Sequence, residues 1–230
     1  MGSEIDLPAD VVRHLVQVLR MRKGQEILLF NGEDGIDYRA ELTETGKRHA
    51  RTRILSGGDP EPLPDLRIHL ALGISRGERM DLAIQKAVEL GVSSIAPLVT
   101  ERTQRKLTPD RLEKKVRHWH KIIISACEQS GRRWLPQLDA PQDLDDWLKN
   151  PLPQTLFLDP EARQCLTEVS RPEQDLGLLI GPEGGFSERE RTLAKEAGCT
   201  GVHLGPRILR TETAPMAAIA AIQVLWGDFC

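Results

Sequence analysis

The stretch that most constrains the fold is residues 204–223, which join a glycine turn, a charged loop and an almost wholly apolar helix. Between residues 217 and 225 the only polar residue is Gln223. A helix with no polar face is buried on every side, so we expect this one in a core. The loop before it, residues 207–213, holds two arginines, one glutamate and two threonines. Burying such groups is costly unless they meet partners there.

A second stretch, residues 178–190, reads LLIGPEGGFSERE and has the same order of a short apolar strand, a glycine-rich turn and a helix start. Ser187 and Glu190 form an S-x-x-E capping box, which predicts that the helix begins there. Three glycines lie in the turn: Gly181, Gly184 and Gly185. Glycines let the backbone pass where a side chain would block it, as a loop against a ligand requires. A tight strand-to-helix turn without any ligand is the alternative for this stretch alone.

Together the two stretches closely resemble the RsmE family of SPOUT-class RNA methyltransferases, in which GPEGG follows a strand and a segment like LGPRILRTETA opens the last helix. The likeness covers nearly the whole chain, through HLVQVLRMRKGQEI, KAVELGVSSIAPL, ERT and ACEQSGR. The resemblance implies an enzyme that uses S-adenosylmethionine (SAM) to methylate N3 of a uridine in 16S ribosomal RNA of the small subunit.

Composition excludes several classes of protein. The 230 residues can bury a full core in one large or two modest domains. No run of eighteen apolar residues and no signal peptide are visible, so we expect a cytoplasmic protein. The four cysteines are far apart and form no C-x-x-C pair, so we expect neither a metal site nor a disulfide framework. The net charge of −3 argues mildly against nucleic-acid binding, but the distribution of charge matters more than its sum.

The first part of the chain reads as a small β domain. Apolar residues with a helical period predict a helix over residues 8–20. Three β-rich runs within residues 25–55, separated by glycine turns, predict an antiparallel sheet or barrel. Members of the family begin with an additional basic and aromatic strand, whereas here the helix lies close to residue 1, so we expect this domain to lack a strand. Residues 56–65 hold two glycines and three prolines and predict an interdomain linker.

After the linker, apolar strands alternate with helices, which is typical of an α/β domain with a mainly parallel sheet. Three of the predicted strands end at Asp159, Gly181 and Gly205, and their loops are expected at one edge of the sheet, where ligands bind. No G-x-G-x-x-G follows a strand, so a dinucleotide site of the Rossmann type is not supported.

The resemblance also implies the identity of the two domains and the residues that bind SAM. It implies a PUA-like β-barrel RNA-binding domain in residues 1–57 and a SPOUT methyltransferase domain in residues 66–230, whose C-terminal segment threads a trefoil knot. General topology rules would not predict a knot. The residues implied to bind SAM are Leu158, Gly181, Pro182, Glu183, Gly184, Gly185, Phe186, Leu204, Gly205, Ile208, Leu209 and Thr213.

Basic residues gather in two regions, one around the predicted first helix (Arg13, His14, Arg20, Arg22 and Lys23) and one in residues 102–121. Residues 102–121, which include the first half of a helix predicted to run from Thr108-Pro109 towards Ser130, hold eight Lys or Arg against two acids. We expect these regions to contact RNA, with an ordinary solvated helix face as the alternative. The predicted RNA-binding residues are Arg13, Arg20, Arg22, Arg102, Arg105, Lys106 and Arg132.

Arg210 and Glu212 are the predicted catalytic residues. Uracil N3 carries a proton and is a poor nucleophile, so the anion formed on losing it needs stabilisation. A guanidinium at Arg210 is suited to donate to a uracil carbonyl, and Glu212 to orient that arginine or accept the proton. The alternatives are a structural ion pair between these two residues and simple capping of the last helix by Thr211 and Thr213.

Two further expectations complete the prediction. The last helix is too apolar for a surface, and SPOUT relatives place it at a two-fold interface, so we expect a homodimer. The alternatives to the preferred activity are ribose 2′-O or other base methylation of tRNA or large-subunit RNA, and a non-catalytic RNA-binding assembly factor. Intact GPEGG and RILRTET segments argue against the second of these.

Overall fold

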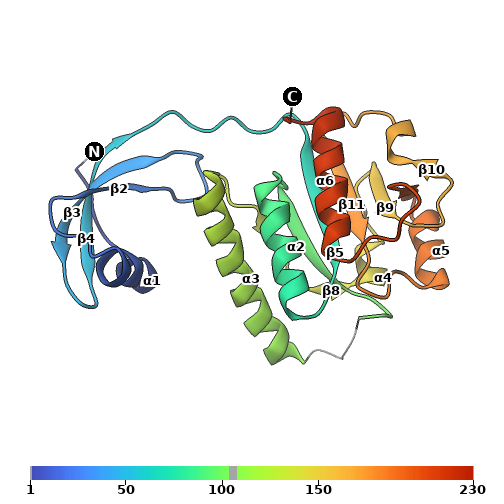
Figure 1. Cartoon of the computed structure of the whole chain (residues 1–230), viewed down its shortest axis with the longest axis horizontal. Coiled ribbons are helices and arrows are strands. Elements are labelled where there is room, and N and C mark those ends of the chain that lie inside the picture. The colour runs from blue at the N-terminus through green and yellow to red at the C-terminus, as the bar shows by residue number, and fades with distance from the viewer. Residues whose placement is uncertain (1, 104–107, 230) are drawn as a thin grey trace. The chain divides into compact units, whose positions relative to one another are not determined.

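The computed structural model describes residues 2–103 and 108–229. They divide into two compact units (Figure 1). The first unit comprises Met1–Pro62 with Arg132–Trp134, and the second comprises Leu63–Gly131 with Leu135–Cys230. The linker prediction is partly wrong, because strand β4 (Ala50–Gly57) continues through its first two residues and the first unit extends to Pro62.

The first unit contains an antiparallel sheet in the order β1-β4-β3-β2. Its other strands are β1 (Glu4–Asp6), β2 (Glu26–Leu29) and β3 (Tyr38–Thr45). The three β-rich runs of the sequence form β2, β3 and β4, as predicted. The sheet is open rather than a closed barrel, since β1 and β2 are its edges. A strand does precede the helix, which the sequence pattern did not predict. Strand β1 has only three residues, all exposed, and so carries no alternation that a sequence pattern could reveal.

The predicted first helix is present but changes its winding. Helix α1 (Ala9–Val12) continues as the π-helical segment η1 (Arg13–Val18). Val12 and Leu15 are buried, whereas Val18 and Leu19 are exposed. The apolar period therefore fits only the first part of the segment, because wider π-winding rotates the later residues away from the buried side.

The second unit is built on a parallel sheet in the order β10-β12-β9-β11-β5-β6-β7, with β8 pairing to β6. Every pairing in it is parallel. Its strands are β5 (Arg67–Gly73), β6 (Ser94–Val99), β7 (Gln137–Leu138), β8 (Gln142–Asp143), β9 (Thr155–Leu158), β10 (Gln164–Cys165), β11 (Asp175–Ile180) and β12 (Thr200–His203). The α/β prediction is confirmed, and the continuous apolar strands are those of a sheet covered on both faces.

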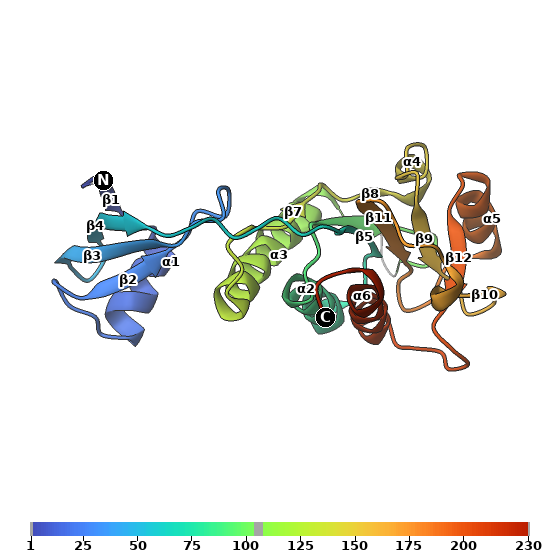
Figure 2. The same ribbon diagram turned by 90° about the horizontal axis from the view of Figure 1, so that it is seen from above.

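Helices cover both faces of this sheet (Figure 2). They are α2 (Gly77–Glu89), α3 (Pro109–Ser130), α4 (Leu144–Trp147), α5 (Glu188–Glu196) and α6 (Thr213–Trp226), with a short 3-10 turn, η2 (Leu166–Glu168). Helices α4 and α5 pack with Phe157 and Leu179 in one core cluster. Figure 2 shows α2 and α6 on the opposite face. Helix α3 begins at Pro109 and ends at the left-handed Gly131, as the sequence predicts.

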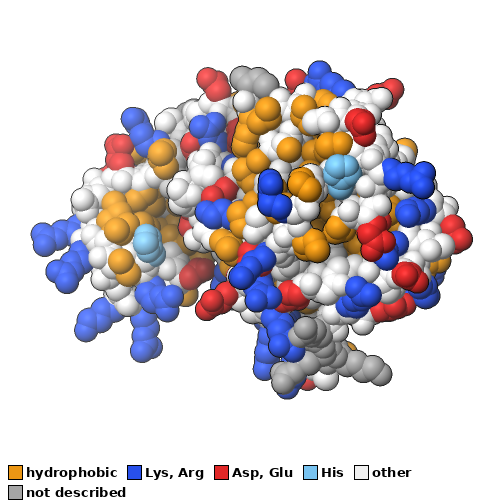
Figure 3. Space-filling model, turned by 45° about the vertical axis from the view of Figure 1, so that its right-hand side comes forward, with side chains coloured by type: hydrophobic (Ala, Val, Ile, Leu, Met, Phe, Trp, Pro, Cys, Tyr) orange, Lys and Arg blue, Asp and Glu red, His pale blue; other side chains and the backbone are white. Residues whose placement is uncertain are grey.

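Helix α6 is not buried on every side within one chain, which corrects the expectation from its composition. Ala218, Ile219 and Ile222 are buried, but Leu225 is 42% exposed. Figure 3 shows hydrophobic side chains gathered on this face of the second unit. The polar Gln223 is buried and satisfied, since its amide donates to the carbonyl of Leu90 over 2.9 Å. An apolar stripe of α6 is thus left without cover.

A charged cluster joins the amino ends of β5 and β11. Asp175 accepts hydrogen bonds from Arg67 Nε and Nη2 at 2.8 and 2.6 Å, and its Oδ1 lies 2.8 Å from His69 Nε2. The other ring nitrogen of His69 lies 2.8 Å from Ser94 Oγ on β6. The Arg67 guanidinium, helped by His69, holds the pKa of the Asp175 carboxyl below its ordinary value. The cluster therefore favours the charged carboxylate in the folded state.

We expect Asp175→Asn to lower the free energy of unfolding at pH 7 by about 1.5 kcal/mol, the lower end for hydrogen bonds to a charged group, because these side chains are about a third exposed. A carboxyl whose folded pKa is lowered stabilises the protein above its unfolded pKa and loses that effect as pH falls through the folded pKa. The difference from wild type should therefore shrink below about pH 4. Urea unfolding at pH 7 and pH 3 measures both, and equal stability at pH 7 would contradict this role.

Candidate functional site

Three loops meet at the carboxyl edge of the parallel sheet, after β9, β11 and β12. These strands are neighbours in the order β12-β9-β11, so the prediction that Asp159, Gly181 and Gly205 bring three loops to one edge is confirmed. Ligands of open α/β sheets bind at this edge. The loops after β11 and β12 contain most of the residues predicted to bind SAM.

The loop after β11, residues 181–186, is packed tightly against the end of β5. A Cβ at Gly73 would lie 2.5 Å from Pro182 N, and a Cβ at Gly181 would lie 3.1 Å from the backbone of Gly185. Gly185 differs, because its φ is +65° and, apart from its chain neighbours, no described residue has an atom within 4 Å of the place where its Cβ would be. The loop therefore has one side held by backbone packing and another, at Gly185, that faces open space.

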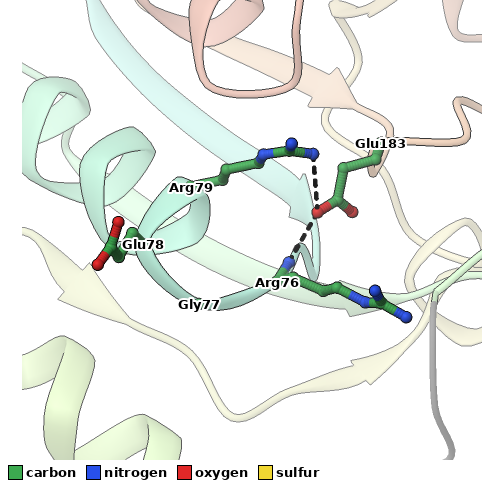
Figure 4. A pocket seen from close by; sticks show the side chains of 5 residues that line it. All are labelled: Arg76, Gly77, Glu78, Arg79 and Glu183. Carbon is green, nitrogen blue, oxygen red and sulfur yellow. Dashed lines mark hydrogen bonds and ion pairs between the residues drawn. The ribbon is translucent and has the colours of Figure 1, made fainter.

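The side chains of this loop point in several directions. Phe186 is 7% exposed and meets Phe157 edge-on with ring centroids 6.4 Å apart, so it anchors the loop in the core. Glu183 is turned to the start of α2, where its Oε1 accepts a hydrogen bond from Arg76 N at 2.9 Å. The same oxygen lies 3.7 Å from Arg79 Nη1 (Figure 4). Phe186 and Glu183 are both predicted to bind SAM, and both make structural contacts that the sequence motif does not reveal.

A cavity of about 390 Å³ opens beside Glu183 at the start of α2. Its lining residues are Arg76, Gly77, Glu78, Arg79 and Glu183. The segment that supplies most of them, ISRGERM at residues 74–80, was not singled out from the sequence. The sequence did contain a signal for it, because this charged segment directly follows an apolar strand, β5, which lies in the middle of the sheet and ends at the same edge.

Arg102, predicted to bind RNA, lies on the outside of the glycine loop. Its Nη1 donates to the carbonyl of Gly184 at 2.6 Å, and a Cβ on Gly184 would come within 3.1 Å of its side chain. The neighbouring Glu101 N donates to Oε1 of the buried Glu190 at 2.8 Å. Glu190 also forms the predicted capping box with Ser187. These contacts hold the glycine loop against the residues that follow β6 and against the start of α5.

Thr211 joins the segment before α6 to the ends of two strands. It is 8% exposed, and its hydroxyl donates to the carbonyl of Gly181 at 3.2 Å. Its Oγ1 also lies 3.4 Å from Ser75 Oγ, just beyond β5. Capping of the last helix by Thr211 is therefore wrong, because Glu212 is the N-cap residue and makes no side-chain cap. Thr213 is exposed at the first position of α6.

Arg210 and Glu212 flank Thr211 and do not pair. Arg210 is exposed, and no ion pair joins it to Glu212 in the described part of the chain. Glu212 Oε2 is buried and has no hydrogen-bond partner among the described residues. A buried carboxylate oxygen without a partner is costly, and active sites are a common place for one. The alternative of a structural Arg210–Glu212 pair is thus not realised.

The loops after β9 and β12 contain both buried and exposed side chains. Leu158 and Leu204 are half-buried, and Asp159 is buried and accepts a hydrogen bond from Glu161 N at 3.0 Å. In the loop after β12, Gly205 has φ +96° and donates its N–H to His203 Nδ1 at 3.1 Å. Leu209 is half-buried and Ile208 is 85% exposed. A large apolar side chain so exposed is suited to cover a ligand or a partner.

The other residues predicted to contact RNA fall into three groups. Arg13, Arg20 and Arg22 are exposed in the first unit, and Arg20 has a left-handed φ of +55°, which is rare outside glycine. Arg132 is half-buried and belongs to the same unit. Arg105 and Lys106 lie outside the described residues.

Residues 2–103 and 108–229 contain neither a cluster of metal-binding side chains nor a helix that could span a membrane. No group of three His, Cys, Asp or Glu side chains there could hold a metal ion. No helix formed by these residues is long and apolar enough to cross a membrane.

Comparisons with known proteins match both units. The model of the RNA methyltransferase domain matches residues 61–223, and that of the RNA methyltransferase PUA domain matches residues 7–55. Ribosomal RNA small subunit methyltransferase E of Buchnera aphidicola subsp. Schizaphis graminum is 37% identical, over 99% of this chain and 93% of its own.

Solved structures agree. The methyltransferase of the same name from Neisseria gonorrhoeae, bound to S-adenosyl methionine, is 42% identical with a TM-score of 0.91, over 100% of this chain and 94% of its own. The methyltransferase Lpg2936 of Legionella pneumophila, in complex with SAM, is 40% identical with a TM-score of 0.95, over 99% and 94%. The predicted fold class, a parallel-sheet methyltransferase domain after a PUA-like domain, is confirmed. The chain therefore belongs to the RNA methyltransferase family, among the ribosomal RNA small subunit methyltransferase E (RsmE) proteins.

Proposed function

We propose that this protein transfers the methyl group of SAM to N3 of a uridine in 16S ribosomal RNA, acting on the small subunit in the cytoplasm. The observation that carries the proposal is the meeting of three loops at one sheet edge beside Arg210 and Glu212, whose Oε2 has no partner among the described residues. The names of the relatives, and the SAM bound in two similar structures, support the cofactor and the class of RNA. The position N3 follows from the resemblance of residues 207–213 to the family motif.

The residues present fit SAM. Gly185 faces open space with a backbone conformation that other residues rarely adopt, so an adenine or ribose could approach the loop backbone there. We propose that Leu158, residues 181–186, Leu204, Gly205, Ile208, Leu209 and Thr213 hold SAM. When bound, SAM supplies a methyl group on a sulfonium, which is strongly electrophilic. We also propose that the segment before α6 forms a trefoil knot, supported by the bond from Thr211 to Gly181.

The work left to the protein is to make uracil N3 nucleophilic. Arg210 is exposed next to the loop of Gly181 and can donate from its fork to a carbonyl oxygen of the uracil anion. Glu212 has a free carboxylate oxygen to orient that arginine or to accept the N3 proton. Arg210 and Glu212 are the neighbours of Thr211 in the sequence. The hydrogen bond from the Thr211 hydroxyl to the carbonyl of Gly181 therefore keeps both residues close to the glycine loop.

Tritium transfer from labelled SAM to isolated small ribosomal subunits, followed by nucleoside analysis, tests the function. We expect label in 3-methyluridine of 16S RNA. Label in a ribose 2′-O position, in tRNA or in large-subunit RNA would contradict the proposed target. Failure to transfer methyl groups to any RNA, with subunits still bound, would favour a non-catalytic assembly factor.

We propose that RNA is bound by basic residues of both units: Arg13, Arg20, Arg22 and Arg132 in one, and Arg102, Arg105 and Lys106 in the other. Exposed arginines in the first unit support this, as does the match to a PUA domain of RNA methyltransferases. Such contacts are made to phosphates and therefore weaken as salt rises.

We propose a homodimer in which α6 lies at the two-fold interface. The uncovered stripe of α6 supports this, since Val224 and Leu225 are 56% and 42% exposed. Apolar patches of this kind on a helix commonly mark an interface. We expect wild type to sediment as a dimer at micromolar concentration and Leu225→Glu to shift it to a monomer, because a charge would then be buried in the interface. Wild type that sediments as a monomer would contradict the proposal.

A further inference from the structure

The cavity at the start of α2 presents two arginines to solvent. Arg79 is half exposed and Arg76 is exposed. Figure 4 shows the Arg76 guanidinium turned away from Glu183, whereas Arg79 points toward that carboxylate. Glu78 points away from both. The cavity is therefore lined by one arginine held loosely by Glu183 at 3.7 Å and by a second whose guanidinium has no ion pair with a described residue.

The cavity lies beside the proposed reaction centre. Ser75 and Thr211 are both buried, with hydroxyl oxygens 3.4 Å apart. The next residue after Ser75 is Arg76, and the residue before Thr211 is Arg210, and both of these arginines are exposed. Two buried residues in contact thus bring two exposed arginines to neighbouring positions. Glu183 connects the cavity to the glycine loop in the same way, through its bond to Arg76 N.

Gly77 lines the cavity and leaves its own backbone accessible there. Its φ is +45°, and among the described residues no atom beyond its chain neighbours and the nearby helix backbone lies within 4 Å of the place where a Cβ would be. It is the first residue of α2, where backbone N–H groups have no partner within the helix. An anion in the cavity could therefore approach the backbone as well as the guanidinium groups. A phosphate with several oxygens matches such a set of donors.

We propose that Arg76 and Arg79 bind a phosphate of the RNA strand next to the target uridine, with Glu183 holding Arg79 in position. This rests on the proposed function and adds a second anchor beside Arg210. A base that reacts outside a stack needs its backbone held on at least one side. Arginine suits that task because its planar fork matches phosphate oxygens. The carboxylate of SAM is the other anion that two arginines could hold, and it gives a different outcome below.

Arg76→Gln and Arg79→Gln test the proposal, with Arg171→Gln as the matched control. Arg171 is exposed and precedes the amino end of β11, at the opposite edge of the same sheet. Binding to small ribosomal subunits with unmethylated 16S RNA is measured across a range of salt, and SAM affinity is measured by calorimetry on the same proteins. Each test variant should bind subunits severalfold more weakly and lower the salt slope by about one, with SAM affinity unchanged. The control should match wild type in both measurements.

Two results would overturn the proposal. Subunit binding and salt slope equal to those of Arg171→Gln would make these arginines a solvated surface. Reduced SAM affinity with unchanged subunit binding would assign the cavity to the cofactor. Arg76→Gln removes no ion pair in the described part of the chain, so it is the variant least prone to unfold. Because binding requires no methyl transfer, a wild type that failed to make 3-methyluridine would sink the proposed function while the salt slope still decided the phosphate contact.

Discussion

Replacing Arg210 with lysine should lower turnover about a hundredfold or more while SAM affinity and stability stay close to wild type. The substitution keeps the positive charge but loses the planar fork that can donate to a uracil carbonyl. Removing one preorganised donor to a developing anion costs roughly 10² to 10³ in rate. Stability should not change, because Arg210 is exposed and makes no ion pair with Glu212. Single-turnover transfer of tritiated methyl groups to small subunits measures the chemical step directly.

Arg171→Lys is the matched control for this experiment, because Arg171 is also exposed but lies before β11 at the other edge of the sheet. It should transfer methyl groups at the wild-type rate. If Arg210→Lys also kept near-wild-type turnover, the catalytic role of the guanidinium would be wrong. If Arg210→Lys instead lowered the thermal stability so far that much of the protein was unfolded in the assay, the lost rate would indicate a structural role.

Local sequence signals predicted most of the fold. The capping box of Ser187 and Glu190, the proline start of α3 and its end at Gly131 are all decided by residues within one turn, and each is confirmed. The apolar strands of the second unit were found because a buried parallel strand is continuous in hydrophobicity. The two-residue strands β7, β8 and β10 were missed. Two residues have no period, so only their pairing with neighbours defines them.

The candidate site was predicted less completely, because its arrangement depends on contacts between distant segments. The motif placed Glu183 in the SAM loop but could not show that it bonds to Arg76, 107 residues away in sequence. For the same reason the sequence predicted RNA contact for Arg102 but not its hydrogen bond to the carbonyl of Gly184. The capping role of Thr211 was wrong because its hydroxyl bonds to Gly181 across the sheet edge. Residue types can suggest the chemistry of a site, but contacts between distant segments have to be read from the structure.

Gly185→Val should abolish measurable SAM binding. The residue has φ +65° and faces open space, so a valine side chain would project into the volume that we assign to SAM. Two effects combine, since a branched side chain fills the space and the left-handed backbone costs roughly 1–2 kcal/mol for a residue with a Cβ. Calorimetry with SAM on the folded variant measures the first effect, and thermal unfolding measures the second.

Gly198→Val separates these two effects. Gly198 has φ +87°, and in the described part of the chain only its chain neighbours have atoms within 4 Å of where a Cβ would be. It lies between α5 and β12, before the amino end of that strand. Both variants should therefore lose similar stability from backbone strain, while only Gly185→Val should lose SAM. Normal SAM binding by folded Gly185→Val would remove this loop from the cofactor site. Equal loss of SAM binding in both variants would mean that strain, and not the filled space, is responsible.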